Sequence, residues 1–126
     1  MPTRSARTAW NGGLQDGSGQ VELTSSGVGT YDVSFPKRAA DDADGTTSPE
    51  ELVAAAHSAC YAMSLSNLAT EAGGFKLTGI KLTVRGEVEG LDEAGFKDAA
   101  EKAKAGCPIS KALAGVEITL DATLES

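Results

Sequence analysis

Two cysteines in contrasting local sequences are the residues of this chain best suited to chemistry. Cys60 lies in the apolar, alanine-rich run SPEELVAAAHSACYAMSLSNL, whereas Cys107 opens the segment GCPISKAL. A thiol becomes a nucleophile only as its thiolate, so the charges near each cysteine decide which one reacts. The elements that carry these cysteines must therefore also deliver a positive charge to one of them.

Cys60 needs a positive charge from another part of the chain. It lies about eleven residues past the first helical position, roughly 16 Å along a helix axis. The helix dipole no longer acts there, and burial disfavours a thiolate. Arg38, in the preceding loop, is the candidate, because a guanidinium stays charged and presents a rigid fork of donors. Glu50 can hold one face of that fork while the other face meets a thiolate or a peroxide oxygen.

Cys107 stands in the opposite setting, at the start of a helix and ahead of Pro108. The backbone N–H groups at a helix start favour an anion, so physical reasoning alone nominates Cys107 as the thiolate. A disulfide between Cys60 and Cys107 requires the fold to bring their Cα atoms within about 7 Å.

Each of these residues also has an interpretation without chemistry. Cys60 can be a core residue of an alanine-rich helix, Arg38 one of eleven basic residues, and Glu50 a partner of the helix dipole. His57, three residues before Cys60 on the same helical face, is either a base or a buried histidine with satisfied hydrogen bonds. Two cysteines and a single histidine cannot fill a tetrahedral zinc site without carboxylate ligands.

Composition restricts the remaining functions. A chain of 126 residues is expected to form one domain. The formal charge of −7 argues against nucleic-acid partners and anionic membrane surfaces. No run approaches the roughly 20 apolar residues of a membrane span, and the N-terminal segment MPTRSARTAW lacks the apolar stretch of a signal peptide. We therefore expect a cytoplasmic protein without membrane or nucleic-acid partners.

The pattern of apolar residues predicts an α+β fold. Alternating segments separated by glycines predict the strands, and Ser48, Pro49 and Glu51 mark the start of a long helix with a capping box. That helix is apolar or small on nearly every face, which predicts a central, buried helix. The expected elements are N-terminal strands over about 6–35, a loop over 36–47, the central helix over about 49–70, a strand over about 75–89, helices over about 92–105 and 108–114, and a C-terminal strand over about 115–125.

Several segments taken together resemble a known family. TSPEELVAAAHSACYAMSL, LTVRGEVEG and AKAGCPISKAL are similar to the OsmC/Ohr family of thiol-dependent hydroperoxidases, and the opening TAWNGG fits the OsmC branch. The resemblance implies a swapped homodimer with antiparallel sheets around two long central helices, one from each subunit. It also implies two active sites at the subunit interface.

The resemblance further assigns a role to each candidate residue. Cys60 matches the peroxidatic cysteine, Cys107 the resolving cysteine, Arg38 the activating arginine and Glu50 the carboxylate that holds it. The implied chemistry is attack of the Cys60 thiolate on a peroxide O–O bond, after which Cys107 forms a disulfide with the sulfenic acid. An external dithiol, either a small molecule or lipoyl-linked, re-reduces members of this family, so the resemblance implies no bound cofactor. Apolar walls around Cys60 imply a preference for organic hydroperoxides.

One departure from the family and two rival functions complete the predictions. Near residues 72–74 the chain is about 15 to 20 residues short by resemblance, either because an edge strand has been lost or because a disordered stretch is omitted. The rival functions on the same scaffold are a non-catalytic binder of hydrophobic ligands and a redox sensor.

Overall fold

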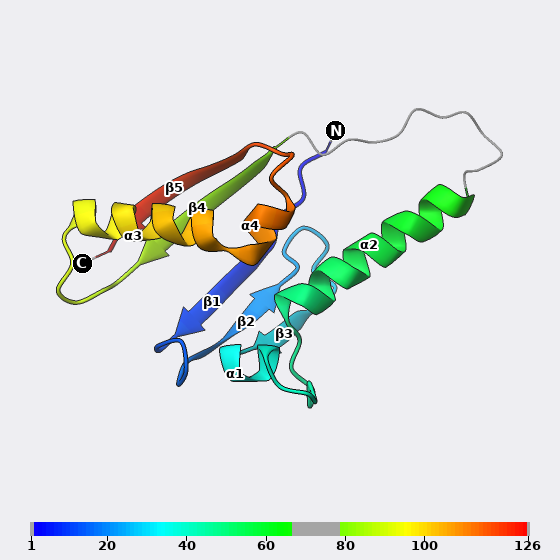
Figure 1. Cartoon of the computed structure of the whole chain (residues 1–126), viewed down its shortest axis with the longest axis horizontal. Helices are drawn as coiled ribbons and strands as arrows, with labels where there is room; N and C mark the ends of the chain where they lie inside the picture. Colours follow the sequence, from blue (N-terminus) through cyan, green and yellow to red (C-terminus); the bar gives the residue numbers. More distant parts are fainter. Residues whose placement is uncertain (1, 67–78, 126) are drawn as a thin grey trace. The chain divides into compact units, whose positions relative to one another are not determined.

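The chain folds into two compact units, each with its own sheet. The computed structural model describes residues 2–66 and 79–125, and the units are Met1–Ala72 and Gly73–Ser126. A three-stranded sheet belongs to the first unit and a two-stranded sheet to the second (Figure 1). Each unit carries its own backbone ladder, and the single domain expected from the sequence stays a prediction.

The first unit is built on an antiparallel meander. Its strands are β1 (Arg7–Asn11), β2 (Ser18–Glu22) and β3 (Thr30–Val33), paired in the order β1-β2-β3. Alternation of side chains places Trp10, Val21 and Tyr31 on one face of the sheet. Val21, on the middle strand, is its buried residue, with 8% of its surface exposed.

A short helix begins where the sequence predicts a loop. Helix α1 (Phe35–Arg38) follows β3 directly, and Ser34 caps it by accepting a hydrogen bond from the Lys37 N–H. A serine followed two residues later by Pro36 is a favourable helix start. The helix is one turn long, and Arg38 is its last residue.

The loop that follows α1 is closed at its base. Val33 and Thr47 form an isolated parallel bridge, and the Thr47 N–H donates to the Asp32 carbonyl oxygen at 2.9 Å. Lys37 of α1 forms an ion pair with Asp44 of the loop at 3.3 Å. The end of β3 and the start of the next helix are thereby held together.

Helix α2 (Pro49–Ser66) starts as its capping residues predict, with one difference. The Glu51 N–H donates to Ser48 Oγ at 3.1 Å, which is half of a capping box. The Glu51 carboxylate accepts a hydrogen bond from the Thr47 hydroxyl instead of completing the box, because the β-bridge holds Thr47 beside it. Residues 67–70 of the predicted helix lie outside the described residues.

Most of α2 carries little cover within its own unit. From residue 50 to residue 63 every side chain is exposed except Leu52, which is half-buried. Val53 is 44% exposed and Tyr61 64% exposed. The sequence predicts a long, buried central helix. The structure shows the helix, but its described side chains are not buried within unit 1.

The second unit is a β-α-β arrangement. Strands β4 (Ile80–Gly86) and β5 (Ile118–Leu124) pair in parallel, with Ile80 opposite Ile118. The prediction of antiparallel sheets is wrong for this pair. A connection that contains two helices, α3 (Glu93–Gly106) and α4 (Pro108–Ala112), returns the chain to the same end of the sheet, and such a crossover makes the strands parallel. Residues 75–78 of the predicted strand lie outside the described residues.

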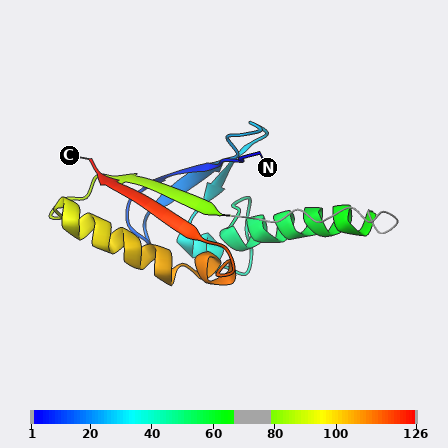
Figure 2. The same ribbon diagram turned by 90° about the horizontal axis from the view of Figure 1, so that it is seen from above.

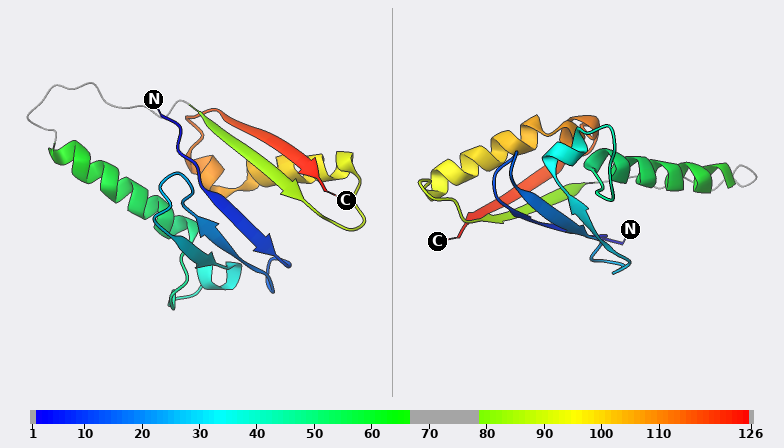
Figure 3. Two further views of the ribbon diagram at one scale, coloured as in Figure 1. Left: turned by 180° about the vertical axis from the view of Figure 1, so that it is seen from behind. Right: turned by 90° about the horizontal axis from the view of Figure 1, so that it is seen from below.

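Helix α3 covers one face of this sheet. Phe96 is its buried residue, with 8% of its surface exposed, and Ala122 of β5 is buried as well. The ring of Phe96 lies against Gly86, where a β-carbon would come within 2.8 Å of it. Figures 2 and 3 show α3 running along the two strands from further directions. The opposite face of α3 carries ion pairs such as Lys97 with Glu93, so this helix is amphipathic in the ordinary way.

Within the described residues, none of the helices has both the length and the apolar character needed to cross a membrane.

Candidate functional site

Arg38 and Glu50 form a two-pronged ion pair at the start of α2. Arg38 Nε lies 2.9 Å from each oxygen of the Glu50 carboxylate, and Arg38 Nη2 lies 2.6 Å from Oε2. Helix α1 supplies the arginine and the first turn of α2 supplies the glutamate, while the Val33–Thr47 bridge holds the two helix ends together. The side chain of Arg38 is only 26% exposed, so its guanidinium is partly withdrawn from water.

The pair fixes the charge state of both groups. The hydrogen bonds from Arg38 are the main cause that lowers the pKa of Glu50, and a backbone hydrogen bond at Glu50 adds to them. Arginine stays protonated in proteins. The pair is therefore a positive group held in place by an ionised carboxylate.

Cys60 lies on the same helix as Glu50 but far along it. Ten residues separate them, which is about 15 Å along the helix axis. At about 100° per residue, one stripe of α2 collects several side chains that we call the cysteine face. The cysteine face comprises Glu50, Val53, His57, Cys60 and Tyr61.

The opposite side of α2 belongs to unit 1 itself. Leu52 and Ala55 line a groove of about 570 Å³ together with Leu23 and Tyr31 from the strand region. The cysteine face points away from this groove, and His57 and Cys60 on it are exposed. Within one chain, the structure thus brings Arg38 to Glu50 and leaves Cys60 about three turns away.

Cys107 lies in the second unit, at the junction of α3 and α4. Its N–H donates to the Ala103 carbonyl oxygen, and its own carbonyl accepts from the Lys111 N–H. It is the N-cap residue of α4 by backbone position, and its side chain makes no capping hydrogen bond. Because α4 has only five residues, its start is a weak source of dipole stabilisation.

An apolar groove of about 600 Å³ surrounds the half-buried Cys107. Aliphatic and aromatic side chains of the sheet and of both helices line it, and the polar contributions come from Lys104 and Ser110. The apolar lining consists of Ile80, Leu82, Val84, Phe96, Ala99, Ala100, Ala103, Ile109, Leu113, Ile118 and Leu120. The structure holds Cys60 and Cys107 as thiols, each in its own unit.

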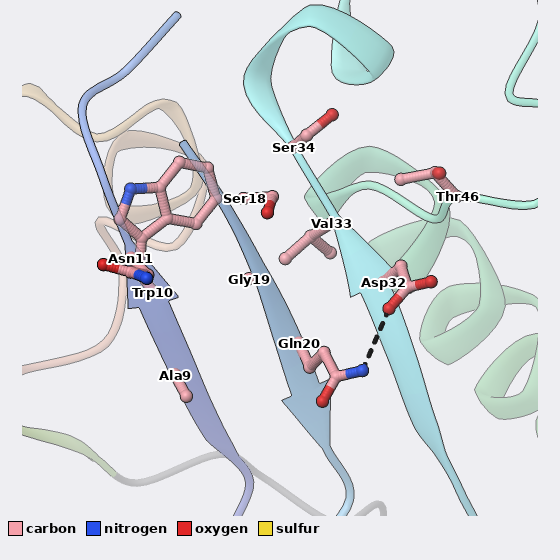
Figure 4. Close-up of a pocket in the computed structure, with 10 residues that line it drawn as sticks. All are labelled: Ala9, Trp10, Asn11, Ser18, Gly19, Gln20, Asp32, Val33, Ser34 and Thr46. Atoms are coloured by element: carbon pink, nitrogen blue, oxygen red, sulfur yellow. Dashed lines mark hydrogen bonds between the residues drawn. The ribbon is translucent and has the colours of Figure 1, made fainter. Parts of the chain in front are cut away.

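A groove on the three-stranded sheet was not anticipated from the sequence. It measures about 580 Å³ and is lined by Trp10, Gly19 and Val33 among others. Figure 4 shows its lining residues, with the Gln20 amide donating to Asp32 at 3.1 Å. A β-carbon at Gly19 would meet the indole of Trp10 at 2.9 Å, so this glycine makes room for the ring. The tryptophan in TAWNGG was the available sequence signal.

Comparison with known proteins places the chain in a family. A family model described as OsmC-like protein matches residues 41–90. Proteins named peroxiredoxin OsmC from Escherichia coli (strain K12) and Shigella flexneri are each 34% identical to the chain over 142 positions. Those alignments cover 98% of this chain and 97% of each relative. The chain belongs to the OsmC family. It is an enzyme of the peroxidase class.

The alignment also bears on the length of this OsmC family member. Since 98% of its 126 residues are spread over 142 aligned positions, about 18 of those positions have no residue from this chain. This agrees with the shortfall that the sequence predicts. The expected place of the gap, near residues 72–74, lies outside the described residues.

The described part of this OsmC family protein contains no group of three or more His, Cys, Asp and Glu side chains arranged to hold a metal ion.

Proposed function

We propose that this OsmC family peroxidase reduces organic hydroperoxides through Cys60. The Cys60 thiolate attacks the terminal oxygen of the hydroperoxide and breaks the O–O bond. Sulfur is oxidised to the sulfenic acid, and the organic oxygen leaves and is protonated to the alcohol. The Cys107 thiol then condenses with the sulfenic acid, which releases water and forms a Cys60–Cys107 disulfide. An external dithiol reduces the disulfide, so the cycle needs no bound cofactor.

The observation that carries this proposal is the Arg38–Glu50 pair. It presents a partly buried, permanently charged guanidinium whose orientation is fixed by two-pronged hydrogen bonds. Such a group can stabilise a thiolate and orient a peroxide oxygen without spending energy on reorganisation during the reaction. Its distance of about 15 Å along α2 from Cys60 of the same chain argues that the two meet across a subunit interface.

A twofold dimer would join these parts. If α2 packs antiparallel against α2 of a second copy, with the crossing midway between residues 50 and 60, Cys60 lies beside Glu50 of the partner subunit. Val53 and Ala54 are at that crossing, and small residues allow two helices to approach closely. The exposed Val53 and Tyr61 of the cysteine face would be buried there. In this proposal the two α2 helices are the central helices of a swapped dimer.

The substrate and reductant follow from the same surroundings. Ala56 and Met63 lie one turn to either side of Cys60 on α2, and these exposed apolar side chains would favour hydroperoxides with an organic group over hydrogen peroxide. Reduction of the disulfide by a dithiol suits a reducing compartment, and we propose the cytosol.

Single-turnover chemistry tests the proposal. One equivalent of cumene hydroperoxide is added to the wild type, Cys60→Ser and Cys107→Ser, and thiol loss and masses are followed. We expect a Cys60–Cys107 disulfide in the wild type and a Cys60 sulfenic acid in Cys107→Ser. If Cys60→Ser consumes peroxide as fast as the wild type, Cys60 is not the attacking thiol. If no variant reacts within minutes, the protein does not reduce this class of substrate.

The apolar groove around Cys107 favours a second candidate, binding of a hydrophobic ligand without turnover. Its volume of about 600 Å³ is within the range of small-molecule sites. Binding of a fluorescent fatty acid by the Cys60→Ser variant, combined with an unreactive wild type, would favour this candidate over the peroxidase cycle.

A further inference from the structure

The Arg38–Glu50 pair supplies charge to the proposed reaction but has no proton to give. Arg38 remains a cation throughout the accessible pH range. The pKa of Glu50 is lowered by its hydrogen bonds to Arg38, so this carboxyl is ionised at neutral pH. Attack on an alkyl hydroperoxide releases an alkoxide, a strong base that must be protonated as it leaves. The Arg38–Glu50 pair therefore cannot supply this proton.

His57 is the side chain on the cysteine face that can fill this role. Between Leu52 and Ser66 it is the only residue of the Asp, Glu, Lys, Arg or His type. It lies on the described part of α2, three residues before Cys60, and both side chains are exposed. Residues spaced by three on a helix have their β-carbons about 5–6 Å apart.

The direction of the side chains strengthens this placement. In an α-helix every Cα–Cβ bond tilts toward the N-terminus, so Cys60 leans over the turn that carries His57. A hydroperoxide approaching Cys60 would place its attacked oxygen about 3–3.5 Å from the sulfur, with the leaving oxygen one bond further out. An imidazole one turn away can reach that oxygen at about 2.6–3.2 Å, the distance a general acid requires.

We propose that His57 is the general acid of this reaction and protonates the oxygen that leaves when Cys60 attacks a hydroperoxide. The proposal rests on the function proposed above. The Cys60 thiolate forms a bond to the terminal oxygen, and the O–O electron pair passes to the organic oxygen. The imidazolium of His57 gives its proton to that oxygen, which yields the alcohol, a Cys60 sulfenic acid and neutral imidazole. Sulfur is oxidised by two electrons, and the two peroxide oxygens together gain them as the O–O bond breaks.

Tyr61 is the other group on this face that carries a proton. It lies four residues after His57, beside Cys60, and is 64% exposed. Of the charged groups, Glu50 starts the same face of α2 and Arg38 of α1 is bound to it. Because Glu50 and Arg38 have no proton to give, the choice lies between the imidazole and the phenol. Tyr61→Phe is thus the matched control for His57→Asn.

The test varies the leaving group rather than the residue alone. Cumene hydroperoxide releases an alkoxide, which needs a proton. Peracetic acid releases acetate and iodoacetamide releases iodide, and neither anion needs one. The rate of Cys60 thiol loss is measured with each reagent in the wild type, His57→Asn, His57→Gln and Tyr61→Phe. His57→Gln provides a second neutral replacement if His57→Asn folds poorly, and the iodoacetamide rate reports whether the surroundings of Cys60 are intact.

We expect the His57 variants to lose roughly 10²-fold in rate with cumene hydroperoxide, the usual contribution of a general acid. With peracetic acid and iodoacetamide they should keep the wild-type rate. An equal loss with all three reagents, no loss with any, or a selective loss in Tyr61→Phe overturns the proposal. A wild type that reacts with iodoacetamide but with neither peroxide overturns the proposed function itself.

Discussion

Helices α2 and α3 differ in how far their apolar side chains are buried within their own units. Helix α3 is amphipathic, and its apolar side lies on the β4–β5 sheet of its own unit, with Phe96 buried against Gly86. Helix α2 is longer and more apolar, yet its described side chains beyond Leu52 are exposed within unit 1. Helix α3 thus packs on the sheet of its own unit, whereas the described side chains of α2 beyond Leu52 have no such cover within unit 1.

The difference teaches where the function of the chain is placed. Helix α3 ends at Gly106, directly before Cys107. Helix α2 carries Cys60, and its first turn holds Glu50 of the Arg38–Glu50 pair. Apolar side chains left in water cost about 25 cal/mol per Å². Covering these side chains in an assembly would therefore release free energy, and in the proposed function that assembly also forms the site.

The largest effect should come from placing a charge on the cysteine face. Val53→Glu would put a carboxylate at the proposed crossing of two α2 helices, where removing it from water costs free energy. We expect a monomer in analytical ultracentrifugation and loss of peroxide reduction. Ala105→Glu on the exposed surface of α3 is the control and should keep both properties. A Val53→Glu protein that remains an active dimer would contradict the role of this face.

Truncation of Phe96 tests whether α3 depends on burial within unit 2. Phe96→Ala removes a buried ring, which typically lowers the free energy of unfolding by about 3–5 kcal/mol. Leu91→Ala, at a residue 41% exposed in the same unit, is the control and should lower it by less than about 1 kcal/mol. Urea unfolding followed by far-ultraviolet circular dichroism, which detects loss of α3, measures both. Similar losses in the two variants would mean that Phe96 is not the anchor of this unit.

Removal of Arg38 tests whether the charge in unit 1 serves Cys60. We expect Arg38→Ala to slow the reaction of Cys60 with cumene hydroperoxide by about 10²–10³-fold, the usual cost of losing a fixed electrostatic stabiliser. Lys37→Ala removes the neighbouring cation, which pairs with Asp44 instead, and should leave the rate unchanged. Stopped-flow measurement of thiol loss decides, and equal rates in wild type and Arg38→Ala would exclude the arginine from activation.

The smallest effect concerns pH. Because the pKa of Glu50 is lowered in the folded protein, its ion pair stabilises the fold above the ordinary value of 4.5. That contribution is lost as pH falls through the lowered pKa. The carboxylate is 56% exposed, so we expect at most about 1 kcal/mol.

Unfolding free energies at pH 7 and at acidic pH measure this contribution. Glu50→Gln should flatten the dependence slightly, and Glu87→Gln, at an exposed position, corrects for the loss of one negative charge. If both variants follow the same curve, the Arg38–Glu50 pair adds nothing to stability.

Local signals in the sequence were sufficient for the elements that depend on neighbouring residues. Ser48 and Pro49 mark the start of α2, and Asp92 caps α3 by accepting a hydrogen bond from the Gly95 N–H. Alternation predicts the strands of the meander. Helix α1 was missed although Ser34 and Pro36 carry its start signal, because one turn gives no periodicity to detect.

Relations between distant residues were harder to predict. The parallel pairing of β4 and β5 depends on how α3 and α4 return the chain, which alternation within each strand does not encode. The Arg38–Glu50 contact depends on the Val33–Thr47 bridge, which no pattern in the sequence announces. The distance between Glu50 and Cys60, in contrast, could be read from residue numbers once the helix was predicted.

The bridge between Val33 and Thr47 closes the segment between them into a loop, and the length of that loop can change. Loop-closure entropy rises only slowly with length, by about 0.6 kcal/mol for each doubling. Residues 39–43 lie between Arg38, the last residue of α1, and Asp44, the partner of Lys37. Extra residues inserted there would lengthen the loop without moving Val33 or Thr47. This OsmC family enzyme therefore offers a place close to Arg38 for a probe or a tether.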